Sequence, residues 1–140
     1  VETPAAAIMT PVFAKYVDFF SIGTNDLVQY TLACDRGNAS ISHLYNHFNP
    51  AVLRLIRRTI TSAREAGIWA GMCGEMASDP NAAVLLMAMG IHELSMSAPS
   101  IPRVKEKLRA VSSIQAKEVL SDVMKMEDAD EIKAYLQKVL

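Results

Sequence analysis

Short apolar segments alternate with longer segments of helical periodicity along most of the chain. Val17–Ile22 and Ile68–Met72 are rich in aromatic or branched residues, and Leu94–Met96 is a weaker third segment, so we expect three strands there. Strands that alternate with helices indicate parallel crossover units, as in open doubly wound sheets and closed (β/α)8 barrels. The pattern therefore predicts an α/β fold with parallel strands.

A repeated start signal, a small polar residue followed by proline, predicts the helices. Thr3, Asn49 and Asp79 each precede a proline, whose missing N–H costs nothing in the first helical turn. Gly67 and Gly90 stand where left-handed caps are expected. The predicted helices are Pro4–Lys15, Pro50–Ala66, Pro80–Met89 and, from a looser start, Pro102–Val111.

After residue 111 the alternation stops. Two helices, Ile114–Lys125 and Ala129–Leu140, are predicted from apolar positions at helical spacing. We therefore divide the domain into βα units over about 1–111 and a helical tail over 112–140. About four units fit, which is half of a (β/α)8 barrel. Since Val1 begins what is predicted to be the end of a strand, we expect a piece of a longer protein.

Composition narrows the class of protein. The 140 residues are 51% hydrophobic and 21% charged, as in one globular domain with a buried core. With 14 basic and 15 acidic side chains the net charge is -1, so no domain-wide field attracts nucleic acid or an anionic membrane. No segment suits a transmembrane helix, and the start lacks the basic region of an export signal. We expect a cytoplasmic protein without membrane insertion.

The two cysteines, Cys34 and Cys73, have neither C-x-x-C spacing nor a histidine cluster nearby, so a zinc site and a redox pair are poorly supported. Cys73 stands between Gly71 and Gly74, which allow a ligand to approach the sulfur. The thiol could then act as acid, base or nucleophile. The alternative is a buried cysteine that packs as a small hydrophobic side chain, and this is what we expect of Cys34.

Functional residues of parallel βα folds gather at the carboxyl ends of strands. Glu2 and Asp26 each follow a predicted strand, and their carboxylates form a candidate Mg²⁺ site if those strands are neighbours. The alternative is a frayed terminal residue and a helix cap. The turn Gly23–Asp26 offers backbone N–H groups to an anion such as phosphate. Arg36 could clamp that anion or pair with Asp35 on the surface.

The three histidines carry no recognisable motif. His43 and His47 are spaced i, i+4 without the H-E-x-x-H motif of zinc proteases, and the Asn49–Pro50 cap beyond them indicates a loop. We expect structural or surface roles for these two residues and for His92.

Several segments together resemble the phosphoenolpyruvate (PEP)-binding barrel of the PEP-utilising enzymes. Within that family they are most similar to the PEP-protein phosphotransferases, enzyme I of the bacterial sugar phosphotransferase system. Pyruvate phosphate dikinase and PEP synthase share the GTNDL-like and CG motifs, but Gln29–Thr31 and Ser42–Tyr45 fit the phosphotransferases better. The resemblance extends from Val1 to about Arg109. Its main segments are Phe19–Leu32, Asp35–Asn38, Gly71–Glu75 and Leu94–Ala98.

The resemblance implies the C-terminal half of a (β/α)8 TIM-type barrel, followed by extra helices, with Mg²⁺ as cofactor. By similarity, Glu2 and Asp26 would hold Mg²⁺. Asn25 and the Asp26 backbone would contact the phosphate end of PEP, and Arg36 would neutralise phosphate charge. Cys73 would be the general acid that protonates the enolate carbon as pyruvate forms.

The resemblance also implies partners. The family forms homodimers through this barrel, and the phosphocarrier protein HPr would bind through an N-terminal domain outside this chain. The phospho-accepting histidine and further PEP-binding arginines also lie outside it, so we expect this chain alone to bind PEP weakly and to transfer no phosphoryl group. The alternatives are a piece of pyruvate phosphate dikinase or PEP synthase, or a non-catalytic dimerisation module.

Overall fold

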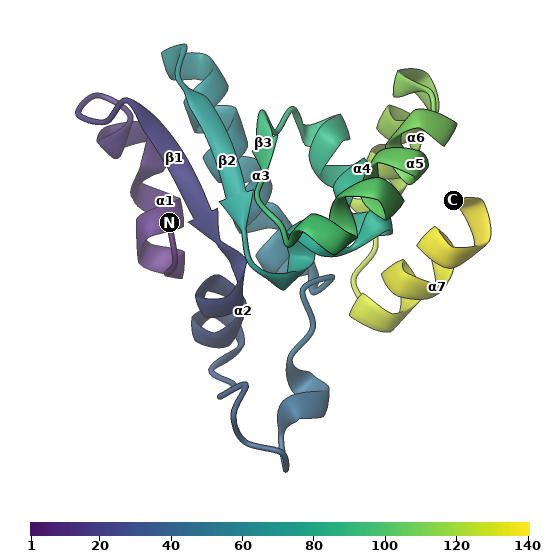
Figure 1. Ribbon diagram of the computed structural model, residues 1–140. Coiled ribbons are helices and arrows are strands. Elements are labelled where there is room, and N and C mark those ends of the chain that lie inside the picture. Colours follow the sequence, from purple (N-terminus) through teal and green to yellow (C-terminus); the bar gives the residue numbers. More distant parts are fainter.

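The computed structural model describes all residues 1–140, and its centre is a parallel sheet of three strands (Figure 1). The strands lie in the order β1 (Phe19–Gly23), β2 (Trp69–Cys73) and β3 (Glu93–Leu94). Gly23 pairs with Cys73, so β1 and β2 end side by side. The prediction of parallel strands is confirmed. The third strand is shorter than predicted, because only two of its residues pair with β2.

The first residue extends the sheet beyond β1. The backbone N–H of Gly23 donates to the Val1 carbonyl at 3.0 Å, and the amine of Val1 donates to the Ser21 carbonyl. These two bonds have the pattern of a parallel strand pair. Glu2 therefore leaves the sheet beside the carboxyl end of β1, as the prediction of neighbouring strands requires.

The helix starts follow the predicted caps. The side chains of Thr3, Asn49 and Asp79 each accept a hydrogen bond from a backbone N–H in the first turn. Two helices have the predicted bounds, since Gly67 at φ +70° and Gly90 at φ +94° end them in the left-handed conformation. Thr3, Asn49 and Asp79 thus precede α1 (Pro4–Phe13), α3 (Pro50–Ala66) and α4 (Pro80–Met89). The helices that follow are α5 (Ile101–Ala110), α6 (Ser113–Val123) and α7 (Ala129–Val139).

The helix α2 (Thr24–Leu32) is predicted only as a helix start at its first residues. It has no proline start and buries little apolar surface, because only Thr24, Leu27 and Val28 are buried. Local periodicity therefore does not distinguish it from a loop. It follows β1 directly, and Figure 1 shows it beyond the carboxyl end of that strand.

Helices cover only one face of the sheet. Alternate residues of β1 and β2 join the core with Leu53 and Ile56 of α3, and α1 and α3 lie behind these strands in Figure 1. On the other face, Phe19 and Trp69 stack with 4.4 Å between ring centroids but stay 46% and 39% exposed. Open doubly wound sheets have helices on both faces, whereas (β/α)8 barrels have them on the outer face only. The buried strand residues are Phe20, Ile22, Ala70 and Met72.

The helical tail covers α4 rather than the sheet. Both α5 and α6 pack on α4, and α6 contacts α7. Val119 and Val123 of α6 join the core together with Ile132 and Leu136 of α7. The tail therefore has a packing role. None of the helices combines the length and apolar character needed to cross a bilayer.

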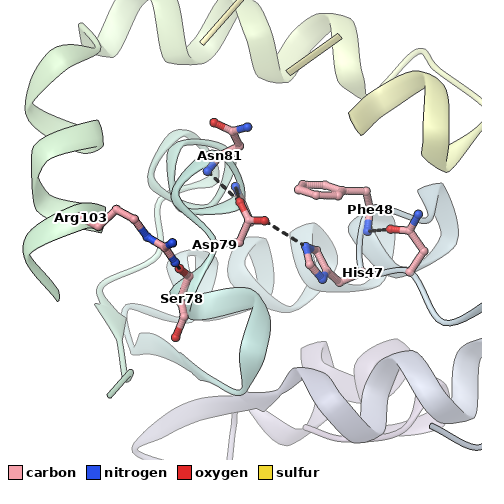
Figure 2. A network of polar contacts seen from close by, with 8 residues as sticks. His47, Phe48, Ser78, Asp79, Asn81 and Arg103 are labelled. Carbon is pink, nitrogen blue, oxygen red and sulfur yellow. Dashed lines mark hydrogen bonds and ion pairs between the residues drawn. The ribbon is translucent and has the colours of Figure 1, made fainter. Parts of the chain in front are cut away.

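His47 and Asp79 connect the loop before α3 to the start of α4 (Figure 2). His47 Nε2 lies 3.7 Å from Asp79 Oδ2, and Asp79 Oδ1 accepts from the N–H groups of Asn81 at 2.8 Å and Ala82 at 3.0 Å. Burial by itself raises the pKa of Asp79, but His47 and the two N–H donors outweigh it and hold the pKa below its ordinary value. The expected structural role of His47 is confirmed.

Replacing Asp79 should lower stability in a pH-dependent way. Asp79→Ala should reduce the free energy of unfolding by about 1 kcal/mol through loss of the cap, and Asp79→Asn by less, because asparagine also caps. The folded-state pKa of Asp79 is lowered, so its charge stabilises the fold above about pH 4 and this contribution is lost as pH falls through the folded pKa. Urea unfolding should show a gap between wild type and Asp79→Asn that is larger at about pH 7 than at about pH 3. An equal difference in unfolding free energy at the two pH values would contradict a stabilising role of the Asp79 charge.

Candidate functional site

The carboxyl ends of β1 and β2 are joined by side-chain hydrogen bonds. The Thr24 hydroxyl donates to the Cys73 carbonyl at 2.9 Å, and the N–H of Glu75 donates to Asn25 Oδ1 at 3.1 Å. Cys73 Sγ lies 3.7 Å from the Ile22 carbonyl oxygen. These contacts hold the start of α2 against the end of β2. We refer to residues 23–26 and 73–75 as the strand-end cluster.

Gly74 makes this close approach possible. Its backbone has φ +100° and ψ -179°, a conformation essentially restricted to glycine. A Cβ at this position would lie 2.4 Å from Thr24 Oγ1 and 2.9 Å from Asn25 Oδ1. The cluster therefore depends on glycine here for both backbone conformation and space.

The Asn25 side chain has a defined orientation at the start of α2. Its Oδ1 accepts from the Glu75 N–H, which leaves the Nδ2 group to donate to a ligand. Free backbone N–H groups and the helix dipole also favour negative charge at a helix start. This end of α2 therefore presents several donors to an anion.

Glu2 lies directly over Gly23. A Cβ on Gly23 would be 2.7 Å from Glu2 Oε1, and Asp26 follows in the first turn of α2. The structure thus brings both predicted carboxylate residues to the end of β1. No group of three or more histidine, cysteine or acidic side chains in the chain is arranged to hold a metal ion. A cation at these two carboxylates would need further oxygen ligands from water or substrate.

Tyr45, to which the sequence analysis assigns no role, packs on the same helix start. Its hydroxyl donates to the Asn25 carbonyl at 3.0 Å. Burial raises the pKa of Tyr45 above its ordinary value, and the carboxylates of Glu75 and Asp26 raise it further, whereas the Arg36 guanidinium lowers it. Arg36, in the loop after α2, thus offsets the effect of the acidic side chains on the Tyr45 hydroxyl.

Arg36 does not pair with Asp35. The Asp35 carboxylate instead accepts from the N–H of Gly37 at 2.8 Å, and no salt bridge involves either residue. The N–H of Arg36 donates to Gln29 Oε1 at 3.2 Å, which ties the loop to α2. The surface-pair interpretation of Arg36 is not supported, because the structure has no salt bridge between these two side chains. The guanidinium is left available to an anion.

The two cysteines occupy different environments. Cys34 is buried and its thiol contacts the Ile41 carbonyl at 3.1 Å, so its expected packing role is confirmed. Cys73 is exposed on the uncovered face of the sheet. Within this chain Cys73 is therefore not the buried cysteine of the alternative interpretation, and its thiol is accessible.

None of the histidines lies in the strand-end cluster. His92 Nδ1 accepts from the N–H of Ala70 at 3.2 Å and so completes the pairing between β2 and β3. His43 is exposed in the short turn Ser42–Leu44. The expected structural and surface roles are confirmed for these two residues.

Comparisons with known proteins identify relatives. Residues 1–113 match the family model described as PEP-utilising enzyme, PEP-binding domain. The chain is 51% identical over 140 residues to a phosphoenolpyruvate-protein phosphotransferase of Haemophilus influenzae, and 48% identical over 138 residues to one of Geobacillus stearothermophilus. These alignments cover 100% and 99% of the chain but 24% of each relative. The chain spans about a quarter of the length of the curated relatives it matches.

Gly74→Ala should disrupt the strand-end cluster. We expect a loss of at least about 3 kcal/mol in the free energy of unfolding, because the added methyl group meets Thr24 and Asn25 and the backbone is strained. Gly67→Ala is the matched control. Its φ is also positive, but a Cβ there meets nothing within 4 Å, so it should cost only about 1 kcal/mol. Urea unfolding measures both, and equal costs would contradict the role given to the contact at Gly74.

Proposed function

Since the chain belongs to the PEP-utilising enzymes, we propose that it is the PEP-binding and pyruvate-forming segment of a PEP-dependent protein phosphotransferase that feeds sugar uptake. The observation that carries the proposal is the strand-end cluster. It brings carboxylate, amide and thiol groups from separate segments to the ends of two adjacent strands. These are the types of group that binding a phosphorylated carboxylic acid and protonating its carbon require.

The uncovered sheet face supports the (β/α)8 barrel alternative. In a barrel, helices cover the outer face of each strand, and the inner face packs against the other strands. The face that carries Phe19, Trp69 and Cys73 would be the inner one. Ile8 and Val12 of α1 are also 52% and 42% exposed, which fits a surface covered by further protein, such as the rest of a barrel or a homodimer partner.

The phosphate end of PEP would bind at the start of α2. Asn25 Nδ2 and the backbone N–H groups there are oriented donors, and Arg36 adds a full positive charge nearby. Tyr45 holds the Asn25 carbonyl and thereby the first turn of the helix. The donors are thus in place before substrate arrives.

Glu2 and Asp26 fit a Mg²⁺ ion by their chemistry. Both are hard oxygen donors beside Gly23, and Mg²⁺ commonly takes one or two carboxylates and completes its octahedron with water and substrate oxygens. When bound, Mg²⁺ would stabilise the negative charge that develops on the enolate oxygen.

Cys73 would supply the proton that completes the reaction. When the bond between phosphorus and the enol oxygen breaks, that oxygen keeps the electron pair, and the methylene carbon then takes a proton to form pyruvate. The Cys73 thiol is exposed at the strand end, where such a carbon can approach it. A weakly acidic thiol can give up this proton and regain it from water.

The phosphoryl group itself needs an acceptor from outside this chain. His47 faces Asp79, and His92 accepts a sheet hydrogen bond. His43 lies in the exposed turn beyond α2. We therefore propose that a histidine of another domain accepts the phosphoryl group and passes it to the phosphocarrier protein HPr, and that this chain alone is inactive.

Asp26→Asn should weaken divalent metal binding. Mn²⁺ is a paramagnetic probe for the Mg²⁺ site, and in the presence of PEP it should broaden the amide NMR signals of residues 23–26. The variant should need at least about tenfold more Mn²⁺ for the same broadening, because it loses a charged ligand. Asp35→Asn, which makes the same charge change in the neighbouring loop, should behave like wild type. Equal effects of both changes would exclude Asp26 as a metal ligand.

Cys73 and Arg36 should affect different steps in a full-length phosphotransferase that contains this chain. Cys73→Ala should slow pyruvate formation by about 10²- to 10⁴-fold with little change in PEP affinity, because only proton transfer is lost. Arg36→Gln should weaken PEP binding by about tenfold or more. Arg109→Gln in α5 also removes one exposed arginine and is the control, so it should bind PEP like wild type. Unchanged turnover in Cys73→Ala would contradict the acid role.

A further inference from the structure

A groove on the outer side of α3 gathers three arginines. Arg54, Arg57 and Arg58 lie at i, i+3 and i+4 on the helix and line an open groove of about 510 Å³. Pro11 of α1 and Met124, which follows α6, lie along its sides. The groove therefore runs over three separate helical segments. The groove lies on the side of α3 that faces away from the sheet, since the opposite side of this helix packs on the strands.

One of these arginines is held in place. Nε and Nη2 of Arg58 both donate to the Ile8 carbonyl of α1, at 3.1 and 3.0 Å. A guanidinium has five N–H donors, so the group is fixed across the gap between α1 and α3 and still has donors to offer. Arg54 and Arg57 take part in no hydrogen bond of their side chains and in no salt bridge.

The charge of the groove differs from that of the rest of the chain. Three arginines face one carboxylate, Glu65, while the chain as a whole carries a net charge of -1. Like charges at i, i+3 and i+4 of a helix repel one another. An anion bound between the arginines would offset their mutual repulsion and accept charge-assisted hydrogen bonds from them.

We propose that this α3 arginine groove binds a compact, multiply charged phosphate anion. The planar guanidinium fork matches two oxygens of a phosphate group, and a phosphate with two or more charges can meet several forks at once. A single carboxylate carries one negative charge and balances the charge of only one guanidinium. The hydroxyl of Thr61, which also lines the groove, adds a neutral donor. The groove is separate from the strand-end cluster, so this proposal does not rest on the function proposed for that cluster.

Inorganic pyrophosphate is the probe for the test. We would titrate it into the 140-residue chain at constant ionic strength and follow backbone amide and arginine Nε NMR signals. Saturable shifts should appear at residues 54–61 of α3. The double variant R54Q/R57Q should weaken binding by at least about tenfold, because charge-assisted hydrogen bonds are lost. Neither side chain makes a bond within the fold, so this variant should retain wild-type urea unfolding.

Two control variants make the result decisive. R64Q/R109Q removes the same charge from exposed positions outside the groove and should leave the affinity unchanged. Arg36→Gln should also leave the shifts in α3 unchanged. Shifts that do not saturate, or equal weakening in both double variants, would mean general attraction to charge and would overturn the proposal. Loss of the α3 shifts in Arg36→Gln would assign the anion to the strand-end cluster and would also overturn it.

Discussion

The contact between Gly74 and the start of α2 is the constraint on which the candidate site depends. With no side chain at Gly74, the backbone after β2 comes close enough for Glu75 to donate to Asn25 and for Thr24 to donate to Cys73. Two hydrogen bonds thus join the ends of two neighbouring strands. The orientation of the Asn25 amide follows from this approach.

The one-sided cover of the sheet organises the rest of the molecule. Because helices pack on one face only, Cys73 and the stacked pair of Phe19 and Trp69 remain exposed on the other. The covering helices have two distinct sides. Helix α3 buries Leu53 and Ile56 against the sheet and presents arginines outward. The open sheet face and the arginine groove on α3 are thus chemically different surfaces on opposite sides of one sheet.

Individual residues show how far the sequence could predict the site. The residues alone allowed Arg36 either to bind an anion or to pair with Asp35, and the structure shows no salt bridge between the two side chains. They also allowed Cys73 to be either a reactive or a buried thiol. The thiol is exposed in the structure because no helix covers that face of the sheet. Tyr45 lies in the family-like segment Ser42–Tyr45, but no role was predicted for it, because its contact with Asn25 joins residues 20 positions apart. Family resemblance assigned roles to matching residues but did not supply these contacts.

The sequence by itself determined the local features of this protein. Caps at Asn49 and Asp79 and the glycine stops of α3 and α4 involve residues within one turn of each other, so their chemistry can be read along the chain. Only the tertiary structure decided which strand ends meet, which face of the sheet stays open and which charges share a groove. These outcomes depend on packing between segments far apart in sequence, whose energies no local pattern encodes.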